Sequence, residues 1–382
     1  MAEQRQSGGP LAGIRVVEFA GIGPGPVCGM LLADLGAEVL LIERPPEANG
    51  GGDLGIPRAR RFEVGHRGKA SLALDLRKPQ GLDFARRLLE RADVLIEGFR
   101  PGTMERLGLG PDACLAANPR LVYGRMTGYG QSGALAPRAG HDINYIALSG
   151  ALHAIGRAGQ PPTPPLNLVG DYAGGSMLLA FGIASALVER ARSGQGQVID
   201  AAMVEGAGLL MASFFGMQAA GLVPRPRGEN LLDSGAPFYD VYRCSDGGHV
   251  AFGAIERRFR QVFAERTGFP AELLLDDDPA NWPRLREALA VLFAQRPRDA
   301  WCALLEDTDA CITPVLAPHE VAGHRHNAGR QSFREEQGVV QPSPAPRFSR
   351  SAAAMPTRPP EPGEGGAELA RAWGLEVPSA EG

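Results

Sequence analysis

Cysteine is scarce in this sequence, which has five cysteines among its 382 residues. They are odd in number, widely spaced and form no C-x-x-C pair, at positions Cys28, Cys114, Cys244, Cys302 and Cys311. A disulfide scaffold needs a paired set of cysteines, and a structural zinc site needs closely spaced ligands. The pattern therefore argues against both and predicts a protein of a reducing compartment.

A large excess of charge of one sign is also lacking. The chain has 39 basic and 43 acidic residues, which gives a formal net charge of -4. Nucleic-acid binding generally needs a concentrated basic surface. We therefore expect no nucleic-acid partner, although a local basic cluster can still hold an anionic ligand.

Signals for a membrane or for export are weak. The 19 uncharged residues at 206–224 approach the length of a transmembrane helix, but they include four glycines, Gln218 and Pro224. A buried helix or a linker is the favoured interpretation. Residues 1–10 lack the apolar core of a signal peptide, and residues 378–382 are not a peroxisomal address. We expect a cytoplasmic protein without a membrane partner.

Short apolar runs alternate with helical patterns in the first half of the chain. The runs lie at 14–19, 38–42, 71–76, 94–96, 121–123 and 198–200, and helical patterns lie at 26–36, 82–91 and 174–190. Strands that alternate with helices predict a parallel sheet covered by helices. The fold class predicted here is α/β, with a Rossmann-like large domain.

The pattern changes near residue 235, and the length of the chain favours more than one domain. Apolar runs flank the turn signal SDGG at 245–248 and predict an antiparallel pair, and helical patterns follow it. The prediction is a large domain over 1–201, completed by about 346–382, and a small α+β domain over 235–316. A linker over 202–234 and a return linker over 317–345 would join them. The proline- and glycine-rich tail at 341–366 is expected to be mostly extended.

A dinucleotide-binding motif is suggested but not met. The sequence GIGPGP at 21–26 follows a predicted strand and precedes a predicted helix, yet neither register gives G-x-G-x-x-G. Pro24 and Pro26 also remove two backbone N–H groups that a pyrophosphate would bind. A Rossmann-like chain path without nicotinamide chemistry is the better interpretation.

Two ionisable residues open predicted helices, His141 in GHDINY at 140–145 and Asp171 in GDYAGG at 170–175. The positive end of a helix dipole favours the carboxylate form of Asp171 and the neutral form of His141. Both groups would then be able to accept a proton. Taken alone, Asp171 is better explained as an N-cap and His141 as a structural histidine, and only their combination favours an acid/base pair.

The motif at 140–145 resembles the signature of the α-methylacyl-CoA racemases, which belong to the family III CoA-transferase superfamily. The resemblance continues through the segments 165–171, 194–206, 235–239, 253–256 and 308–316 and covers about residues 10–350. It implies that His141 and Asp171 are the two acid/base residues, that Glu256 pairs with His141, and that Asp142 supports the site. Without the resemblance, Glu256 would be interpreted as a surface carboxylate. The resemblance also implies an interlocked homodimer in which Glu256 acts on the partner chain.

The implied reaction is inversion of the carbon next to a coenzyme A thioester, an isomerase activity. Inversion removes a proton from one face of that carbon and returns one to the other, so it needs two bases on opposite sides. The enolate oxygen also needs donors, for which we consider backbone N–H groups at the helix starts of His141 or Asp171. The chemistry requires neither a metal nor a cofactor, because coenzyme A is part of the substrate. The acyl preference, among branched fatty acyl, bile-acid and aryl-propionyl thioesters, is left open.

Coenzyme A carries several phosphates and is expected to meet basic residues. Arg44, Lys69 and Arg100 lie at predicted strand-associated loops, where open α/β sheets bind ligands. Arg44 and Arg100 match basic positions that contact coenzyme A in the family, although each is also explained as a surface charge. The acyl chain is expected along apolar residues that are equally plausible as core, namely Leu209, Leu210, Met211, Phe214, Phe215 and Met217.

Two other functions are considered. A CoA-transferase of the same superfamily would use the residue that matches Asp171 as a covalent nucleophile. The sequence at 140–145 and the absence of a run of several consecutive glycines argue against this alternative. A CoA-binding protein with an idle site is the other alternative, and the presence of His141, Asp171 and Glu256 argues against it.

Overall fold

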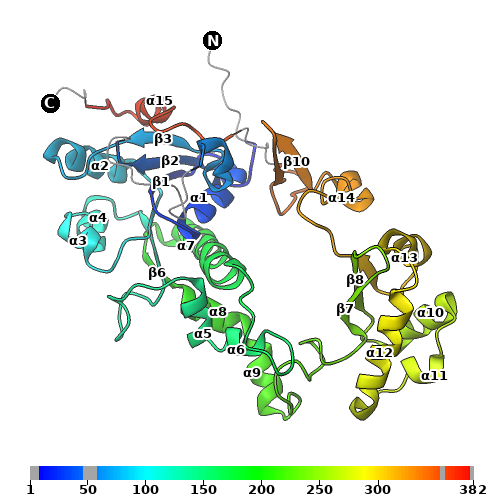
Figure 1. Ribbon diagram of the computed structural model, residues 1–382. Helices are drawn as coiled ribbons and strands as arrows, with labels where there is room; N and C mark the ends of the chain where they lie inside the picture. The colour runs from blue at the N-terminus through cyan, green and yellow to red at the C-terminus, as the bar shows by residue number, and fades with distance from the viewer. Residues whose placement is uncertain (1–7, 46–57, 353–357, 379–382) are drawn as a thin grey trace. The chain divides into compact units, whose positions relative to one another are not determined.

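The computed structural model describes residues 8–45, 58–352 and 358–378 (Figure 1). The terminal segments 1–7 and 379–382, on which part of the targeting expectation depends, lie outside these ranges. The chain divides into two compact units. The large unit comprises Met1–Ser149, Leu166–Leu210 and His324–Gly382, and the small unit comprises Gly150–Pro165 and Met211–Gly323.

The large unit is built on a six-stranded parallel sheet. Its strands are β1 (Arg15–Phe19), β2 (Glu38–Glu43), β3 (Ala70–Ala73), β4 (Val94–Glu97), β5 (Val122–Thr127) and β6 (Val198–Ala202). They lie in the order β3-β2-β1-β4-β5-β6, which is the order of a doubly wound Rossmann sheet. The predicted α/β fold class is confirmed.

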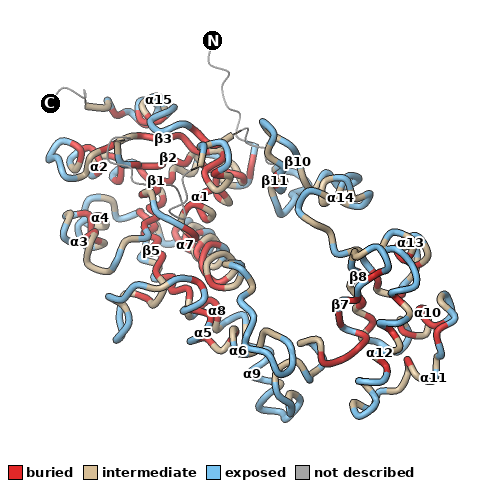
Figure 2. The backbone as a smooth tube through the Cα atoms, viewed as in Figure 1, coloured by how far each residue is buried: buried red, intermediate tan, exposed pale blue. Residues whose placement is uncertain are grey.

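Helices cover both faces of this sheet, and Figure 2 shows its central strands as buried. Burial on both faces agrees with the apolar runs from which the strands were predicted. One face packs on α1 (Pro24–Asp34), α5 (Asp142–Leu148) and α7 (Leu178–Ser193), and the other on α2 (Pro79–Arg91), α3 (Thr103–Arg106), α4 (Pro111–Ala117) and α15 (Gly366–Ala372). Neighbouring residues of β1 divide between the two cores, because Val16 faces the first set and Val17 the second. The unit also contains η2 (Arg60–Phe62), η3 (Val64–His66), the π-helix η4 (Leu168–Met177) and α8 (Met203–Leu210).

The C-terminal segment completes the β3 edge of the sheet. Gly365 forms a parallel bridge with Ser71 of β3, and the following α15 packs against β3 and β2. The indole N–H of Trp373 donates to Glu38 Oε2 over 2.7 Å, and its ring is buried in the core. The tail was expected to be extended as far as residue 366, and the helix that begins there was not predicted.

The small unit contains a three-stranded antiparallel sheet in the order β7-β8-β9. Its elements are α6 (Ala151–Ala154), α9 (Ala212–Ala219), β7 (Tyr239–Arg243), β8 (His249–Gly253), α10 (Arg257–Thr267), α11 (Ala271–Leu274), η5 (Pro279–Asn281), α12 (Trp282–Phe293), α13 (Arg298–Leu305) and β9 (Ile312–Pro314). The antiparallel pair expected around SDGG is confirmed as β7 and β8. Aromatic rings dominate the core, and those of Phe252 and Phe263 lie 4.6 Å apart between centroids.

The two expected linkers contain regular elements. Residues 202–234 include α8 and α9, and residues 317–345 include α14 (Arg325–Arg330), β10 (Phe333–Glu336) and β11 (Val339–Pro342). The β10–β11 hairpin is fixed to the large unit by the buried Arg67, which pairs with Asp34 at 2.5 Å and donates to Gln341 at 2.9 Å. The domain boundaries given above stay predictions.

Within the ranges that the structure describes, one continuous helical segment is long and apolar enough to cross a membrane, judged by length and composition alone. It is Leu168–Ser193, which joins η4 to α7, and not the run at 206–224 that the sequence suggested. Leu179 and Ile183 of α7 are fully buried against the sheet, as in the core helix of a globular domain. A single helix of this kind is weak evidence for a membrane.

Candidate active site

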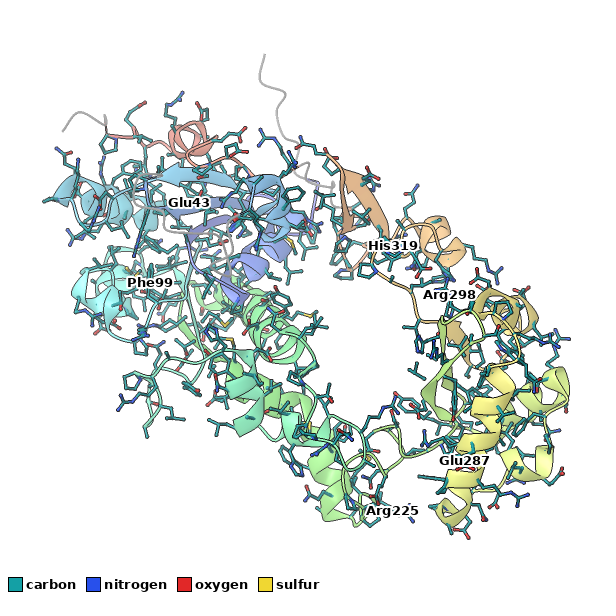
Figure 3. The ribbon with its side chains drawn as sticks, in the orientation of Figure 1. Glu43, Phe99, Arg225, Glu287, Arg298 and His319 are labelled. Atoms are coloured by element: carbon teal, nitrogen blue, oxygen red, sulfur yellow. The ribbon has the colours of Figure 1, made fainter. Side chains whose placement is uncertain are left out.

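The loops expected to bind coenzyme A follow the carboxyl ends of the parallel strands. They therefore lie together at the carboxyl-terminal end of the sheet. Arg44 directly follows β2 and Arg100 follows β4 by three residues, and both side chains are exposed. The two strands flank β1, so these loops lie at the edge where doubly wound sheets bind ligands. Glu43 and Phe99, labelled in Figure 3, mark the residues that immediately precede the two arginines.

The loop that carries Arg100 is fixed by a buried carboxylate. Glu97 Oε2 accepts the backbone N–H of Phe99 at 2.8 Å, and Glu97 Oε1 accepts Nε of Arg125 at 2.9 Å. Burial raises the pKa of Glu97, and the contacts with Phe99 and Arg125 oppose the rise. Arg77 follows the carboxyl end of β3 and is also an exposed cation. It is not among the residues that the sequence predicted to contact coenzyme A.

The structure places Lys69 away from this edge. Its side chain is fully buried, pairs with Glu18 Oε2 at 2.7 Å and donates to the carbonyl oxygen of Pro26 at 2.9 Å. Burial lowers the pKa of Lys69, and the charge of Glu18 opposes the fall. The expected contact between Lys69 and coenzyme A does not agree with this burial, because Lys69 joins β1 to the first turn of α1 in the protein interior.

His141 is the N-cap residue of α5, as the sequence predicted, and its side chain is exposed. Its backbone is extended, and its N–H donates to the side-chain oxygen of Asn144 at 3.0 Å. The hydroxyl of Tyr145 donates to the carbonyl oxygen of Gly140, so the residue before His141 is also held. The GHDINY motif therefore fixes the backbone on both sides of the imidazole.

Asp142 joins the two predicted acid/base residues. Its Oδ2 accepts the backbone N–H of Gly170 at 2.7 Å and that of Asp171 at 2.8 Å. A Cβ at position 170 would lie 2.7 Å from the same oxygen, so only glycine fits there. Asp142 directly follows His141 in the chain and binds the backbone N–H of Asp171. The structure thus brings the segments that carry His141 and Asp171 together.

Asp171 lies near the start of η4 and is half-buried. Burial is the largest influence and raises the pKa of Asp171, against a hydrogen bond from Asn167 Nδ2 to Oδ2 at 3.2 Å that lowers it. The neighbouring carboxylate of Asp142 raises the pKa further, and the charge of His141 lowers it. The expectation that the helix dipole would favour the carboxylate form is therefore outweighed by burial.

The glycine cluster after β1 packs against Asp171. Gly23 has φ 68°, and a Cβ there would lie 3.2 Å from Asp171 Oδ2. Ser176 of η4 donates its hydroxyl to the carbonyl oxygen of Pro24 at 2.8 Å, which holds the two segments together. In the sequence alone, this cluster suggests only a dinucleotide motif, which it does not meet. Gly23 and Asn167 are thus site residues that the sequence did not reveal.

Glu256 is the N-cap residue of α10 in the small unit and has an exposed side chain. Its charge is the second cause, after burial, of a raised pKa at Cys311. The pairing of Glu256 with His141 stays a prediction. In the described ranges, no group of three or more His, Cys, Asp and Glu side chains is arranged to hold a metal ion.

Four of the six residues expected along the acyl chain are exposed in this chain. Leu209 and Leu210 of α8 are 63% and 50% exposed, and Phe214 and Phe215 of α9 are exposed as well. The alternative that these side chains simply fill a core is therefore wrong for these four.

Comparison with known proteins identifies the class. The family described as CoA-transferase family III matches residues 11–365, and the chain belongs to this family. Alpha-methylacyl-CoA racemase of Mus musculus is 46% identical over 368 residues, covering 96% of this chain and 93% of the mouse protein. The human protein of the same name is 46% identical over 88% of this chain and 86% of its own length. Succinyl-CoA–D-citramalate CoA-transferase of Chloroflexus aurantiacus is 36% identical over 70% of this chain and 67% of its own.

Solved structures give the same fold. A CAIB/BAIF family protein from Brucella suis matches with a TM-score of 0.81 at 28% identity, over 96% of this chain and all of that chain. Rv3272 from Mycobacterium tuberculosis matches with a TM-score of 0.75 at 28% identity, over 94% of this chain and 99% of that chain. The doubly wound large unit described above is therefore the fold of this family.

Proposed function

We propose that this chain is an α-methylacyl-CoA racemase that interconverts the (R) and (S) forms of 2-methylacyl-CoA thioesters. The observation that carries the proposal is the link through Asp142, which holds the backbone of Asp171 beside the start of the helix that bears His141. The 46% identity to the mouse and human racemases over most of the chain supports the same activity. The exposed arginines at the carboxyl edge of the sheet support binding of the coenzyme A phosphates.

In the proposed mechanism, His141 and Asp171 exchange protons with opposite faces of the α-carbon. In one direction the Asp171 carboxylate removes the α-proton, and the protonated His141 supplies a proton to the other face of the enolate. The reverse direction uses neutral His141 as the base and protonated Asp171 as the acid. Burial raises the pKa of Asp171, which makes its protonated form more accessible and suits a group that must play both roles.

The enolate oxygen needs hydrogen-bond donors. The two candidate sources are the backbone N–H groups at the start of α5, after His141, and those near Asp171 in η4. The N–H groups of Gly170 and Asp171 are already bound by Asp142. The first N–H groups of α5, at Asp142 and Ile143, have no acceptor within their own helix. We assign the oxyanion-stabilising role to these two, since one such donor is commonly worth about 3–4 kcal/mol in a transition state. The reaction as written needs no cofactor besides the coenzyme A of the substrate.

The function is tested with a single-enantiomer 2-methylacyl-CoA in deuterated water. The expected result is deuterium at the α-carbon together with inversion of configuration. Transfer of coenzyme A to an added carboxylate, without inversion, would instead assign the CoA-transferase activity. Binding of the thioester with neither reaction would leave only the idle CoA-binding protein.

Removing the Asn167 hydrogen bond should move the acidic limb of the pH profile upward. Asp171 acts as a base only when ionised, so activity in that direction is lost as the pH falls through its pKa. Asn167→Ala removes an influence that lowers this pKa, so the loss should begin at a higher pH, by about one unit or less for a bond of ~1 kcal/mol. The measurement is kcat/KM against pH in each direction. Asn281→Ala, which removes a similar contact to Asp276, should leave the limb in place, and a downward shift in Asn167→Ala would contradict the assignment.

The homodimer is also a proposal, and an exposed apolar face supports it. Met177, Phe181 and Val188 follow one side of η4 and α7 and are 61%, 70% and 65% exposed. Such a face needs a partner, and a second copy of this chain is the one we propose.

Placing a charge on this face should separate the chains. Phe181→Asp places a carboxylate in the proposed interface while the chains assemble, so protein produced with this substitution should give the mass of one chain instead of two in light scattering after gel filtration. Val291→Asp, at a valine of α12 that is 65% exposed, is the matched control and should leave the mass unchanged. If Phe181→Asp still has the mass of two chains, this face is not the dimer interface.

A further inference from the structure

The chain leaves the large unit between the two acid/base residues. It passes into the small unit at Gly150, soon after His141 and α5, and returns at Leu166, shortly before Asp171. Residues 150–165, which we call the excursion, therefore connect α5 to η4 but are packed within the small unit. The return point is strained, since Leu166 has φ 57°, a left-handed conformation that non-glycine residues rarely adopt.

A buried carboxylate of the small unit holds the excursion. Asp240 lies on β7, and its side chain is 3% exposed. Its Oδ1 accepts Nη1 of Arg157, which belongs to the excursion, at 2.5 Å, and its Oδ2 accepts Nη1 of Arg286 from α12. Arg286 also donates to the carbonyl oxygens of Ser234 and Gly235, both at 2.7 Å. Arg286 therefore supplies a positive charge that compensates the Asp240 carboxylate. Arg157 ties the excursion to the same carboxylate.

Further contacts make the excursion a closed loop. Arg227 of the small unit donates to the carbonyl oxygens of His153 at 2.9 Å and Gln160 at 2.7 Å. Within the excursion, the N–H of Thr163 donates to the carbonyl oxygen of Ile155 at 2.9 Å. The loop therefore has little freedom to change the separation of its ends.

We propose that Asp240 and Arg157 form a clamp through which the small unit positions the acid/base pair of the large unit. The inference depends on the proposed function, because it concerns the spacing of His141 and Asp171 around one carbon atom. Neither clamp residue touches the substrate in this proposal, so both are positioning residues. Their effect reaches Asp171 through Leu166 and Asn167, the latter of which donates to the Asp171 carboxylate.

The alternative is that the clamp only stabilises the small unit. The two possibilities differ in which parts of the chain change when the contact between Asp240 and Arg157 is weakened. A stabilising contact would change the excursion and the stability of the small unit alone. A positioning clamp would also loosen the flanking helices α5 and η4 and would disturb the balance between the two faces of the α-carbon.

The test uses Arg157→Gln in the full chain, which keeps the Asp240–Arg286 pair and thus a charge partner for the buried carboxylate. Hydrogen exchange followed by mass spectrometry should show faster exchange at 150–165 and also at 142–148 and 168–177. With a single-enantiomer substrate in deuterated water, the ratio of inversion to α-proton exchange should fall by about ten-fold, since small misplacements of reacting groups cost up to ~10²-fold. Arg157→Lys should restore part of the ratio, because it keeps the charge that faces Asp240.

The matched control is Arg298→Gln, which removes another arginine of the small unit that pairs with a carboxylate, Glu320, at 2.7 Å. It should change neither the flanking helices nor the ratio. The clamp is overturned if faster exchange in Arg157→Gln stays confined to 150–165, or if its ratio equals that of the wild type. If the wild type inverts no substrate, the proposed function fails, while the hydrogen exchange of 142–148 and 168–177 still decides whether the clamp acts on them.

Discussion

Asp171→Asn should lower the rate of inversion by ~10²–10⁴-fold, the usual contribution of one positioned acid/base group. The amide has nearly the same size and can keep a hydrogen bond with Asn167, but it neither takes up nor delivers a proton. Exchange of the α-proton should persist for the enantiomer whose proton faces His141 and vanish for the other. The measurement is α-proton exchange and inversion from each pure enantiomer in deuterated water.

The companion variant His141→Ala should show the opposite selectivity between the two enantiomers. Asp83→Asn, on the exposed surface of α2 where it pairs with Arg87, is the matched control and should keep both activities. Equal loss of exchange for both enantiomers in Asp171→Asn would contradict the two-base arrangement. Retained inversion would remove Asp171 from the mechanism altogether.

Lys69→Met should destabilise the large unit by about 3–5 kcal/mol, because it removes the ammonium group that pairs with the fully buried Glu18 carboxylate at 2.7 Å. Thermal unfolding should shift down by roughly 10 °C for a unit of this size. Where the variant still folds, KM for the acyl-CoA should change little, since Lys69 lies in the interior. The measurements are thermal denaturation and steady-state kinetics.

The double variant Glu18→Gln with Lys69→Met is the control for this prediction. It removes both charges, so it should recover part of the lost stability, as replaced ion pairs commonly do. The opposite pattern, an unchanged unfolding temperature with a KM raised many-fold, would restore Lys69 as a contact for coenzyme A.

The sheet of the large unit was predictable from sequence because its signal is local. Strands buried on both faces are short apolar runs, and each of the predicted runs contains or overlaps a strand, from β1 at Arg15–Phe19 to β6 at Val198–Ala202. In the small unit, the helical patterns expected after SDGG are present as α10, α12 and α13. His141 at the start of α5 follows from the same kind of local pattern.

The features that the sequence did not reveal depend on contacts between distant residues. Lys69 is a basic residue beside a predicted strand, and nothing near it shows that Glu18, 51 positions earlier, lies beside it. The raised pKa of Asp171 is caused mainly by burial, which its neighbours in sequence do not disclose. The excursion at 150–165 belongs to the small unit through Asp240, 83 residues after Arg157, so its packing has no local signal.

The bridge between Ser71 and Gly365 and the burial of Trp373 affect the order in which the two units can complete their folding during synthesis. The nascent polypeptide that has reached residue 323 contains every residue of the small unit, whereas the large unit still lacks the helix that closes its β3 edge. The small unit is therefore expected to fold while translation continues, and the Rossmann sheet only after the ribosome has released residue 373. Until then the apolar residues that pack against Ala370 and Trp373 lack their partners.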